Sequence, residues 1–513
     1  MLVRHIPGRL VSMLSRYVAV LLAALLVFYV VREPVNIAVS HLHGRHGTAV
    51  ANGGAASGQV KTPKVIPFAG PGQRGGVGTG AAVPRPEGQI PMVEEAPPYR
   101  KLFKPEPERF EPVHDPFPWL THNNKMPPVL DNNLPPEPHV PEPTPLFIGF
   151  TRNWPMLLQC VSSYIAAGWP PADIHVVENT GTFRANQDDE LSLQNPFFLN
   201  HTQLGILGVH VLQTPTLLSF AQLQNYFLHT ALQRGWPHFY WSHQDVLVFS
   251  DEEVRKKDRD HDHDRDPYAT LYERAVGLLR YLGGEDKPPW ATHFFAYDHL
   301  TLVNRDAYLD VGAWDTHIPF YAGDCDMYLR LHWAGYWQPQ SEAGLIFDVA
   351  APLDDLGALF RLPGTHAAFA GGQTGLDRSH AMYEAELERE RELSAWVERE
   401  GETFQHLVHV AARMQDAKWA DQGVFRNTWQ ARQRGGREDP FYRDPDGFAA
   451  GLDAMIDAGR RVFADKWGHR GCDLLDLGVE AEDAWRLERD WDISEGPGSE
   501  GGSWGKDWMG AGD

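Results

Sequence analysis

The sequence predicts an α/β protein whose core is a mostly parallel sheet flanked by helices. Short apolar segments typical of buried strands alternate with amphipathic segments typical of helices. The strands are expected at 146–150, 173–177, 206–212 and 238–248, and the helices between them at 153–168 and 217–234. Polar residues directly follow several of these strands. In doubly wound sheets, ligands gather at the carboxyl ends of the strands.

The amino terminus carries an uninterrupted apolar segment at residues 17–31, YVAVLLAALLVFYVV, with three arginines before it and few positive charges directly after it. The positive-inside rule then predicts a cytosolic tail at 1–16, a transmembrane signal-anchor at 17–35 and a lumenal remainder, which is single-pass type II topology. A cleaved signal peptide is the alternative, although no clean small-x-small cleavage site follows Val31 before Pro34. The short span suits the thinner early secretory membranes.

Residues 36–144 are rich in Gly, Pro and Ala and then in Pro and Glu, which predicts a flexible stem. The formal charge of −22 argues against nucleic acid as a partner, because a phosphate backbone needs a basic surface. The three cysteines are too scattered for a disulfide framework or a cysteine zinc site, and they allow at most one pair. The glycosylation sequon that starts at Asn200 is consistent with a lumenal surface.

The same patterns give the remaining elements in order. We expect a solvated mixed-charge loop at 251–267, a helix at 268–282, a strand or hairpin at 290–303, a short helix at 304–311, a turn at 312–315 and a helix at 326–335. A helical C-terminal extension is expected at 356–493, with a mobile Gly-rich loop at 357–375, helices from 379, at 448–463 and at 479–491, and then a disordered tail at 494–513.

Three pieces of the sequence stand in a specific order. The first is FTRNWPMLLQCVSSYIAAGWPPADIHVVENTG, a strand, a helix and a second strand that ends in Glu and Asn. The second is a helix bearing Asn225 that leads into a strand interrupted by His243-Gln244-Asp245. The third is VNRDAYLDVGAWDTHIPFYAGDCDMYLRLHWAGY, in which a Gly/Trp turn precedes acids that open a helix. Together they resemble GT-A nucleotide-sugar glycosyltransferases of the inverting, family-2-like type, here in a type II membrane protein of fungal type. The resemblance covers residues 145–350 and implies a catalytic domain at 145–355.

The resemblance implies that Mn²⁺ or Mg²⁺ bridges the phosphates of a nucleoside-diphosphate sugar, because the leaving diphosphate gains negative charge. Asp245 stands where this fold keeps its Asp-x-Asp metal motif, but His243 replaces the first acid. A neutral imidazole can still bind Mn²⁺ or hydrogen-bond to ribose or phosphate. His469 is a distant candidate for an additional metal ligand. The alternative is that residues 243–245 form only a surface turn.

The resemblance also assigns donor and acceptor residues by position. The expected donor-binding residues are Thr151, Arg152, Glu178, Asn179 and Asn225. Trp314 and Asp315 are expected to line the acceptor pocket, and Asp324 is the expected general base. Asp326 reads as the helix N-cap, although two nearby acids can share the duty of the base through raised pKa values. Each assignment has a structural alternative. The residues after the first two strands could be ordinary turn residues, Trp314 could belong to the core, and Asp324 and Asp326 could both only cap the helix.

The sequence thus predicts a Golgi membrane enzyme, type II in topology, whose partners are a nucleoside-diphosphate sugar and a hydroxyl acceptor on a glycan, glycoprotein or glycolipid. Direct inverting displacement at the anomeric carbon is the expected reaction. Two alternatives stay open. One is a retaining transferase on the same fold, and the other is a catalytically silent lumenal scaffold or lectin-like module, which the replacement at His243 favours.

Overall fold

The computed structural model describes residues 112–253, 268–370, 383–420, 430 and 433–490. The predicted membrane segment, most of the stem, most of the mixed-charge loop and the C-terminal tail lie outside these ranges. Among the helices of the described ranges, none has both the length and the apolar character needed to cross a bilayer. The topology therefore stays a prediction.

Six strands form the central sheet in the order β3-β2-β1-β4-β7-β6. Strands β3, β2, β1 and β4 run parallel, whereas β7 is antiparallel to β4 and β6 is antiparallel to β7. Their bounds are β1 (Leu146–Phe150), β2 (Ile174–Glu178), β3 (His210–Gln213), β4 (His238–Ser242), β6 (Thr292–Phe294) and β7 (Leu300–Asn304). The predicted mostly parallel sheet is confirmed, and the expected hairpin at 290–303 is the pair β6 and β7.

The register aligns the carboxyl ends of the parallel strands at one edge of the sheet. Phe150 at the end of β1 lies beside Glu178 at the end of β2, and Glu178 lies beside Gln213 at the end of β3. Ser242, the last residue of β4, pairs with Ile148 of β1. The polar loops after these strands consequently leave the same edge, as the alternation of strands and helices predicted.

The strand expected at 238–248 is two strands that belong to different sheets. After β4 ends at Ser242, residues 246–249 form β5 (Val246–Phe249), which pairs antiparallel with β8 (Leu345–Asp348) in a second, two-stranded sheet. The three polar residues between β4 and β5 are bonded to the surrounding loops rather than to a ladder: Gln244 Nε2 donates to Arg152 O at 2.9 Å. The polar break is the point at which the chain changes sheets.

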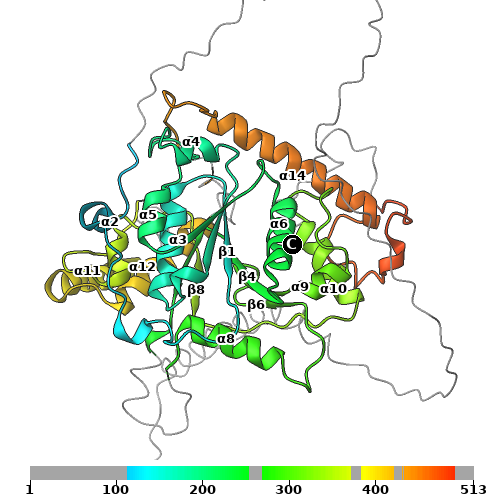
Figure 1. Ribbon diagram of the computed structural model, residues 1–513, viewed down its shortest axis with the longest axis horizontal. Coiled ribbons are helices and arrows are strands. Elements are labelled where there is room, and N and C mark those ends of the chain that lie inside the picture. The colour runs from blue at the N-terminus through cyan, green and yellow to red at the C-terminus, as the bar shows by residue number, and fades with distance from the viewer. Residues whose placement is uncertain (1–111, 254–267, 371–382, 421–429, 431–432, 491–513) are drawn as a thin grey trace, which may run out of the picture. The chain divides into compact units, whose positions relative to one another are not determined.

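Helices cover both faces of the central sheet (Figure 1). Alternate residues of β1 show the division, because Leu146 and Ile148 pack on one side and Phe147 on the other. The first side packs against α3, α8 and the small sheet, and the second against α6, α9 and α10. The bounds are α3 (Trp154–Ala166), η3 (Pro171–Asp173), α4 (Phe183–Gln187), α5 (His201–Ile206), α6 (Phe220–Arg234), α8 (Leu271–Leu282), α9 (Arg305–Asp310) and α10 (Gly323–Trp333).

Local signals in the sequence fix both ends of α6. The hydroxyl of Ser219 accepts from the N–H of Gln222, and the side chain of Gln222 accepts from the N–H of Ser219 at 2.9 Å, which is a capping box. The helix ends at Gly235, whose φ of 71° lies in the left-handed region that glycine adopts without strain. The chain can therefore turn directly into β4, which begins at His238.

The packed structure begins upstream of the expected domain boundary at 145. Residues 112–144 include α2 (Pro118–Asn123) and η2 (Asp131–Asn133). Phe117 and Leu120 are buried in the main core, and the ring of Phe117 stacks on that of Phe360 at 5.8 Å. Large apolar side chains thus anchor the last part of the Pro-rich segment, even though its composition resembles a stem.

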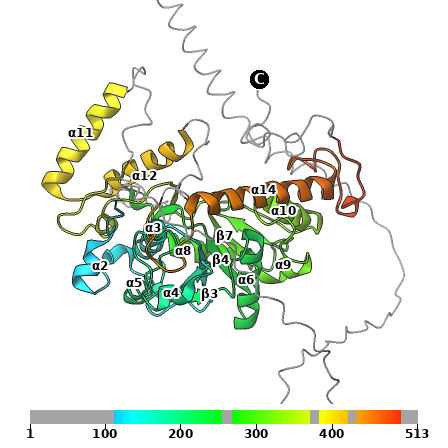
Figure 2. The same cartoon turned by 90° about the horizontal axis from the view of Figure 1, so that it is seen from above.

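The C-terminal helices lie against two different parts of the domain. Their bounds are α11 (Tyr383–Glu400), α12 (Phe404–Trp419) and α14 (Pro445–Trp467). Helix α12 packs on β8 and contributes Leu407, Val410 and Met414 to the main core. Helix α14 runs beside α10 (Figure 2) and buries Phe463 and Trp467 there. The extension therefore contacts both the small sheet and the helix that carries the predicted general base.

Three predictions about local structure are wrong in the described residues. The segment from 357 is not a mobile loop at its start, because η4 (Leu356–Phe360) is buried against the main core. The strand expected at 206–212 begins only at His210, since α5 runs to Ile206 and a turn follows it. The helix expected at 479–491 is reduced to η6 (Ala481–Asp483).

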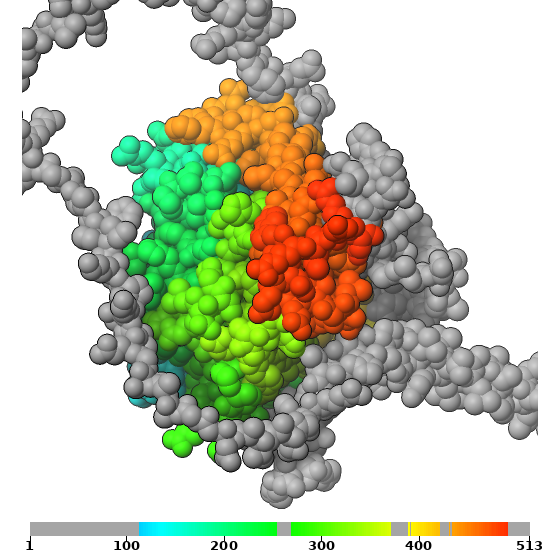
Figure 3. Space-filling view, turned by 90° about the vertical axis from the view of Figure 1, so that its right-hand side faces the viewer, coloured from blue at the N-terminus to red at the C-terminus, as the bar shows by residue number. Residues whose placement is uncertain are grey.

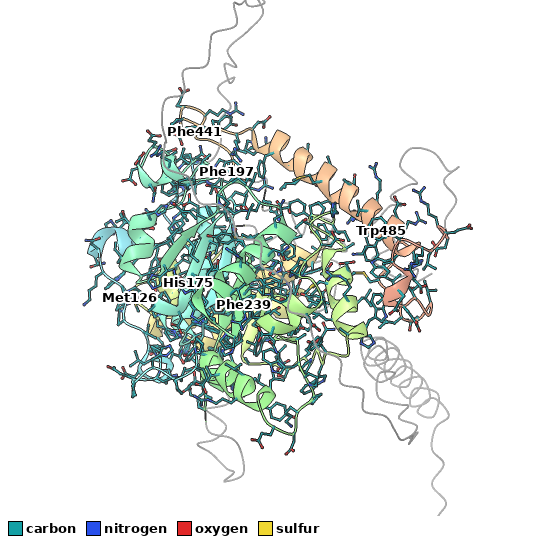
Figure 4. The ribbon with its side chains drawn as sticks, turned by 45° about the vertical axis from the view of Figure 1, so that its right-hand side comes forward. Met126, His175, Phe197, Phe239, Phe441 and Trp485 are labelled. Carbon is teal, nitrogen blue, oxygen red and sulfur yellow. A yellow bond between two sulfur atoms is a disulfide. The ribbon has the colours of Figure 1, made fainter. Side chains whose placement is uncertain are left out.

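Phe441 and Trp485, near the two ends of α14, are largely exposed, whereas Phe239 lies within the sheet (Figure 4).

One disulfide joins α10 to the segment after α14. Cys325 and Cys472 lie with their Cα atoms 5.7 Å apart and close a loop of 147 residues, while Cys160 is buried and free. The residues of α14 and of the segment after it, coloured orange and red, lie against the rest of the domain (Figure 3). The sequence allowed one pair, and the structure forms it between Cys325 and Cys472.

We expect reduction of this disulfide to lower the free energy of unfolding by about 2–4 kcal/mol, because the open chain regains the entropy of a long loop. Thermal unfolding with and without dithiothreitol measures the change. The Cys325→Ser/Cys472→Ser variant should unfold like the reduced protein and should not respond to the reductant. A reductant effect of the same size on that variant would contradict the assignment.

Candidate active site

Asn179 joins the polar loops that leave β1, β2 and β3. Its backbone N–H donates to Phe150 O at 2.6 Å, and its side-chain amide donates to Leu218 O at 2.9 Å. Its Oδ1 accepts from the N–H of Leu218 at 2.7 Å and from the hydroxyl of Thr214 at 3.2 Å. Thr151 Oγ1 accepts a longer bond from the amide at 3.4 Å. The side chain predicted to bind the donor thus holds the three loops together.

Glu178 is buried at the end of β2 with both carboxylate oxygens in use. Its Oε1 accepts from Asn186 Nδ2 at 2.9 Å and from the hydroxyl of Thr180 at 3.2 Å. Its Oε2 pairs with His201 Nε2 at 3.0 Å. Because these partners are all protein groups, Glu178 fixes the loops behind the edge of the sheet. No observation tests its expected contact with a donor.

Arg152 is a buried cation at the end of β1. Its guanidinium lies over the ring of Phe448, 4.8 Å from the centroid, and its Nη2 donates to Gln430 at 3.2 Å. Its Nη1 is buried and finds no hydrogen-bond partner among the described residues. Burial lowers the pKa of Arg152 to about 10. Because a buried donor without a partner is costly, this atom marks a place where an anionic oxygen would bind favourably.

Lys418 of α12 joins two carboxylates at the polar break. Its ammonium lies 2.6 Å from Asp245 Oδ2 and 2.5 Å from Asp348 Oδ1, and it also donates to Val349 O at 3.3 Å. Trp419 Nε1 donates to the other oxygen of Asp348 at 3.0 Å. Asp245 directly precedes β5 and lies next to Asp348, because Val246 is opposite Asp348 in the ladder of β5 and β8. The C-terminal extension therefore supplies the cation of this carboxylate pair.

Two imidazoles lie at the rim of this cluster. His243 Nδ1 is 3.7 Å from Asp245 Oδ1 and its Nε2 is 3.8 Å from Asp298 Oδ1, while His299 Nε2 is 3.6 Å from Asp348 Oδ1. Burial opposes the charged form of His243, but the carboxylates of Asp298, Asp245 and Asp348 outweigh it and raise the pKa of His243 to about 9. At neutral pH the residue that replaces the first acid of the metal motif is therefore a cation.

The charges of the cluster also determine the protonation state of Asp245. Burial alone would favour the neutral acid, but Lys418 and His243 hold the pKa of Asp245 down at about 2. The pKa of Lys418 is raised because Asp245 and Asp348 outweigh the effect of burial. Asp245 is thus a carboxylate and Lys418 an ammonium at physiological pH.

These residues do not fit the divalent cation that the resemblance implied. Hard cations such as Mn²⁺ and Mg²⁺ need several free oxygen ligands, whereas Asp245 Oδ2 and both oxygens of Asp348 already accept from Lys418 and Trp419. Within the described ranges, no three His, Cys, Asp or Glu residues are grouped to hold a metal ion. The assignment of His243 and Asp245 as metal ligands therefore finds no support in this arrangement.

Asp324 lies in the first turn of α10 and faces the same region. Its Oδ2 accepts from the hydroxyl of Tyr297 at 3.0 Å, and its Oδ1 is buried without a hydrogen-bond partner in the described part of the chain. Burial and the nearby charge of Asp298 raise the pKa of Asp324. A carboxylate with increased proton affinity and one unused oxygen suits a general base.

Asp326 is not the N-cap of α10. The helix starts at Gly323 after Ala322, whose side chain makes no cap hydrogen bond. Asp326 is fully buried instead, with Arg330 Nε at 2.8 Å, Lys466 Nζ at 2.6 Å and Trp467 Nε1 at 3.1 Å. Its oxygens are saturated by cations and donors of α10 and α14, which indicates a structural role.

The expected acceptor residues are held by the protein itself. Trp314 is buried in the second core, and its backbone N–H and C=O each bond to the side-chain amide of Asn225 at 2.9 Å. Asp315 pairs with Lys466 at 2.8 Å. Asn225 therefore fixes the turn that precedes α10. His469, the distant metal candidate, pairs with Asp473 at 2.9 Å and with Asp490 in the C-terminal segment.

Sequence patterns missed Asp298, Asp348 and Lys418. Asp298 lies in the turn between β6 and β7, and a hairpin turn is an ordinary place for an aspartate. Asp348 is the last residue of β8, and an acid at the end of an apolar strand was a usable signal. Lys418 lies in a helix with many charged residues, and no local pattern connects it to Asp245.

The described residues thus define an α/β protein with a polar, charged site at the carboxyl ends of its parallel strands. The sequence matches no known protein family and no curated protein. Among solved structures, the chain is similar to a mannosyltransferase from Pyrobaculum calidifontis in complex with GDP-Man and Mn²⁺. The identity is 11% and the TM-score 0.28, over 63% of this chain and 83% of that one.

Two further structures are similar at the same low level. GalNAc-T7, with UDP, GalNAc and Mn²⁺, is 13% identical with a TM-score of 0.26, and the match covers 42% of this chain and 44% of that chain. S. aureus TarS 1-349 is 9% identical with a TM-score of 0.25, over 62% of this chain and 82% of that one. Neighbours at this identity and these TM-scores do not assign a donor, an acceptor or a metal to this chain.

We expect Asp326→Asn to destabilise the protein by about 3–5 kcal/mol, because the change leaves Lys466 and Arg330 without their buried carboxylate. Urea unfolding measures the loss. The exposed Asp453→Asn, in the amino-terminal half of α14, is the control and should change the free energy of unfolding by less than about 0.5 kcal/mol. A stable Asp326→Asn protein would contradict the structural role.

We expect the protein to lose stability between about pH 6.5 and pH 9 through His243. The pKa of His243 is raised in the folded state, so its contribution is fully present below the ordinary value and is lost as the pH rises through about 9. The loss should be on the order of 1 kcal/mol, because a third of this side chain is exposed.

Thermal unfolding of the wild type and of His243→Gln across this pH range tests the expectation. Other histidines titrate in both proteins, so the difference between the two profiles isolates His243. The exposed His229→Gln variant serves as the control and should follow the wild type. Parallel profiles for wild type and His243→Gln would show that the imidazole carries no such charge.

Proposed function

We propose that the chain is a glycosyltransferase that moves a sugar from a nucleoside-diphosphate sugar to a hydroxyl group of a glycan or glycoconjugate. The observation that carries the proposal is the position of Asp298. Its Oδ1 lies 3.8 Å from Nε2 of His243, which follows β4. Its charge also raises the pKa of Asp324 at the start of α10. The edge of the sheet and the candidate base therefore belong to one site.

The proposed reaction is an inverting displacement. Asp324 takes the proton from the acceptor hydroxyl as that oxygen bonds to the anomeric carbon, and the bond from this carbon to the diphosphate oxygen breaks at the same time. The leaving diphosphate carries the electron pair of the broken bond, so it needs positive charge near the strand ends. Arg152 and His243 are two cations near those ends, and we propose that they meet the diphosphate.

We infer further that the catalytic part lies in the lumen of the Golgi and is anchored by the apolar segment at 17–31. The disulfide between Cys325 and Cys472 supports this proposal, because such bonds persist in the secretory pathway and are rare in the cytosol. Protease protection of the full chain in sealed microsomes would test the orientation.

A silent binding module is the second candidate, and one observation favours it. Lys418 fills the space between Asp245 and Asp348, as expected of a site that has lost its catalytic activity and keeps a stabilising ion pair. Such a module would bind a glycan or a nucleotide without transferring a sugar. Loss or retention of transfer in a variant of the candidate base separates the two candidates.

We expect Asp324→Asn to lower the rate of sugar transfer by about 100-fold or more, because an amide cannot accept the proton of the acceptor. The donor is first identified by screening sugar nucleotides for hydrolysis, and transfer is then measured at saturating donor. Binding of the nucleoside diphosphate should persist in this variant.

The exposed Asp286→Asn variant is the control and should transfer at the wild-type rate. The pKa of Asp324 is raised, so the rate should increase with pH through this pKa as the carboxyl group loses its proton. A folded Asp324→Asn protein that transfers sugar at the wild-type rate would exclude Asp324 as the base.

A further inference from the structure

The C-terminal extension contributes Lys418 to the candidate active site. It lies in the last turn of α12, 173 residues after Asp245, and yet its ammonium contacts both Asp245 and Asp348. Only 3% of its side chain is exposed. Lysine is almost never buried to this extent unless it is paired, so the two carboxylates account for its position.

All three N–H groups of this ammonium have acceptors within the protein, namely Asp245 Oδ2, Asp348 Oδ1 and Val349 O. Trp419, the next residue, donates to Asp348 Oδ2. The oxygens that a cation between the two acids would need are therefore already taken. The ammonium stands where a divalent ion would otherwise join the two carboxylates.

Lys466 provides a contrast within the same chain. It also joins two carboxylates, those of Asp315 and Asp326, but the donors around it come from α10 and α14 and its cluster lies beside the disulfide. The Lys418 cluster is bordered by His243 and His299, whose side chains are 33% and 23% exposed. A ligand at the carboxyl ends of the strands can therefore reach the edge of the Lys418 cluster.

We propose that Lys418 is the resident cation of the donor site, so that nucleoside diphosphates bind to this chain without a divalent metal ion. This inference rests on the proposed function, because it concerns the diphosphate of the donor. The ammonium neutralises carboxylates that would otherwise repel phosphate, which is the charge role that a metal ion has in such a site. The phosphate oxygens then meet His243 and the buried Nη1 of Arg152, which has no partner among the described residues.

The test is isothermal titration of the full chain with UDP and with GDP, each in excess EDTA and with saturating Mn²⁺. We expect at least one of the two probes to bind with dissociation constants that agree within about threefold in the two buffers, a difference of less than 1 kcal/mol. Lys418→Met should weaken binding in EDTA by about tenfold or more. Lys418→Arg, which keeps the charge, should bind more tightly than Lys418→Met.

Two further variants serve as controls, one for the charge of the cluster and one for the loss of a buried lysine. Lys418→Met combined with Asp348→Asn removes one charge of each sign and keeps the charge of the cluster at the wild-type value, so it should bind nucleotide in EDTA more tightly than Lys418→Met does. If Lys418→Met does not fold, the comparison of the wild type in EDTA and in Mn²⁺ still decides the role of Lys418. Lys466→Met is the matched control, because it removes a buried lysine that also joins two carboxylates. Its binding of nucleotide should remain insensitive to EDTA.

The outcomes separate the two proposals. Binding by the wild type only in the presence of Mn²⁺ would overturn the role of Lys418 and leave the proposed function standing. Wild-type affinity in EDTA for a folded Lys418→Met protein would overturn it as well. If neither probe binds the wild type in either buffer, the proposed use of a UDP- or GDP-sugar donor fails, and the inference about Lys418 fails with it.

Discussion

The polar break at residues 243–245 is the constraint that places the other parts of the site. The chain cannot continue the ladder of β4 through it, so it leaves the central sheet and starts the small one. The backbone groups of the break bond to other loops: His243 N–H donates to His299 O at 3.2 Å, and Asp245 O accepts from Val349 N–H at 2.8 Å. Gln244 bonds to the loop after β1. Loops that are distant in sequence therefore meet where the parallel strands end.

Two helices of the C-terminal extension each contribute a lysine that neutralises a separate pair of carboxylates. Lys418 from α12 neutralises acids at the break, and Lys466 from α14 neutralises acids on α10. A buried ion pair adds little stability over a well-packed apolar pair, but the loss of one partner is strongly destabilising. These four acids therefore depend on helices that follow them by 70 to 173 residues in the sequence. This dependence explains why the extension is part of the folded unit rather than an appendage.

Local patterns predicted what local physics determines. The strand 146–150 and the helix 153–168 were found nearly where expected, because their apolar periodicity reports burial directly. Periodicity cannot show a change of sheet, so residues 238–248 were read as one strand. Glycine content suggested a loop after 356, but the apolar side chains of Leu356 and Phe360 decide the packing there. Among the site residues, Asp324 was found because it opens a helix, whereas Lys418 was missed because only tertiary structure brings it to Asp245.

Asp298 couples the two halves of the site through its charge. Its carboxylate favours the imidazolium form of His243 and, by repulsion, disfavours the ionised form of Asp324. Both effects favour the protonated form, that of His243 after β4 and that of Asp324 at the start of α10. A diphosphate that enters beside His243 would add negative charge and strengthen both effects, since charges in a site of low dielectric interact over several ångströms. In the proposed reaction, the proton affinity of Asp324 would then be greatest when the donor is bound, which is the state in which the acceptor hydroxyl would lose its proton.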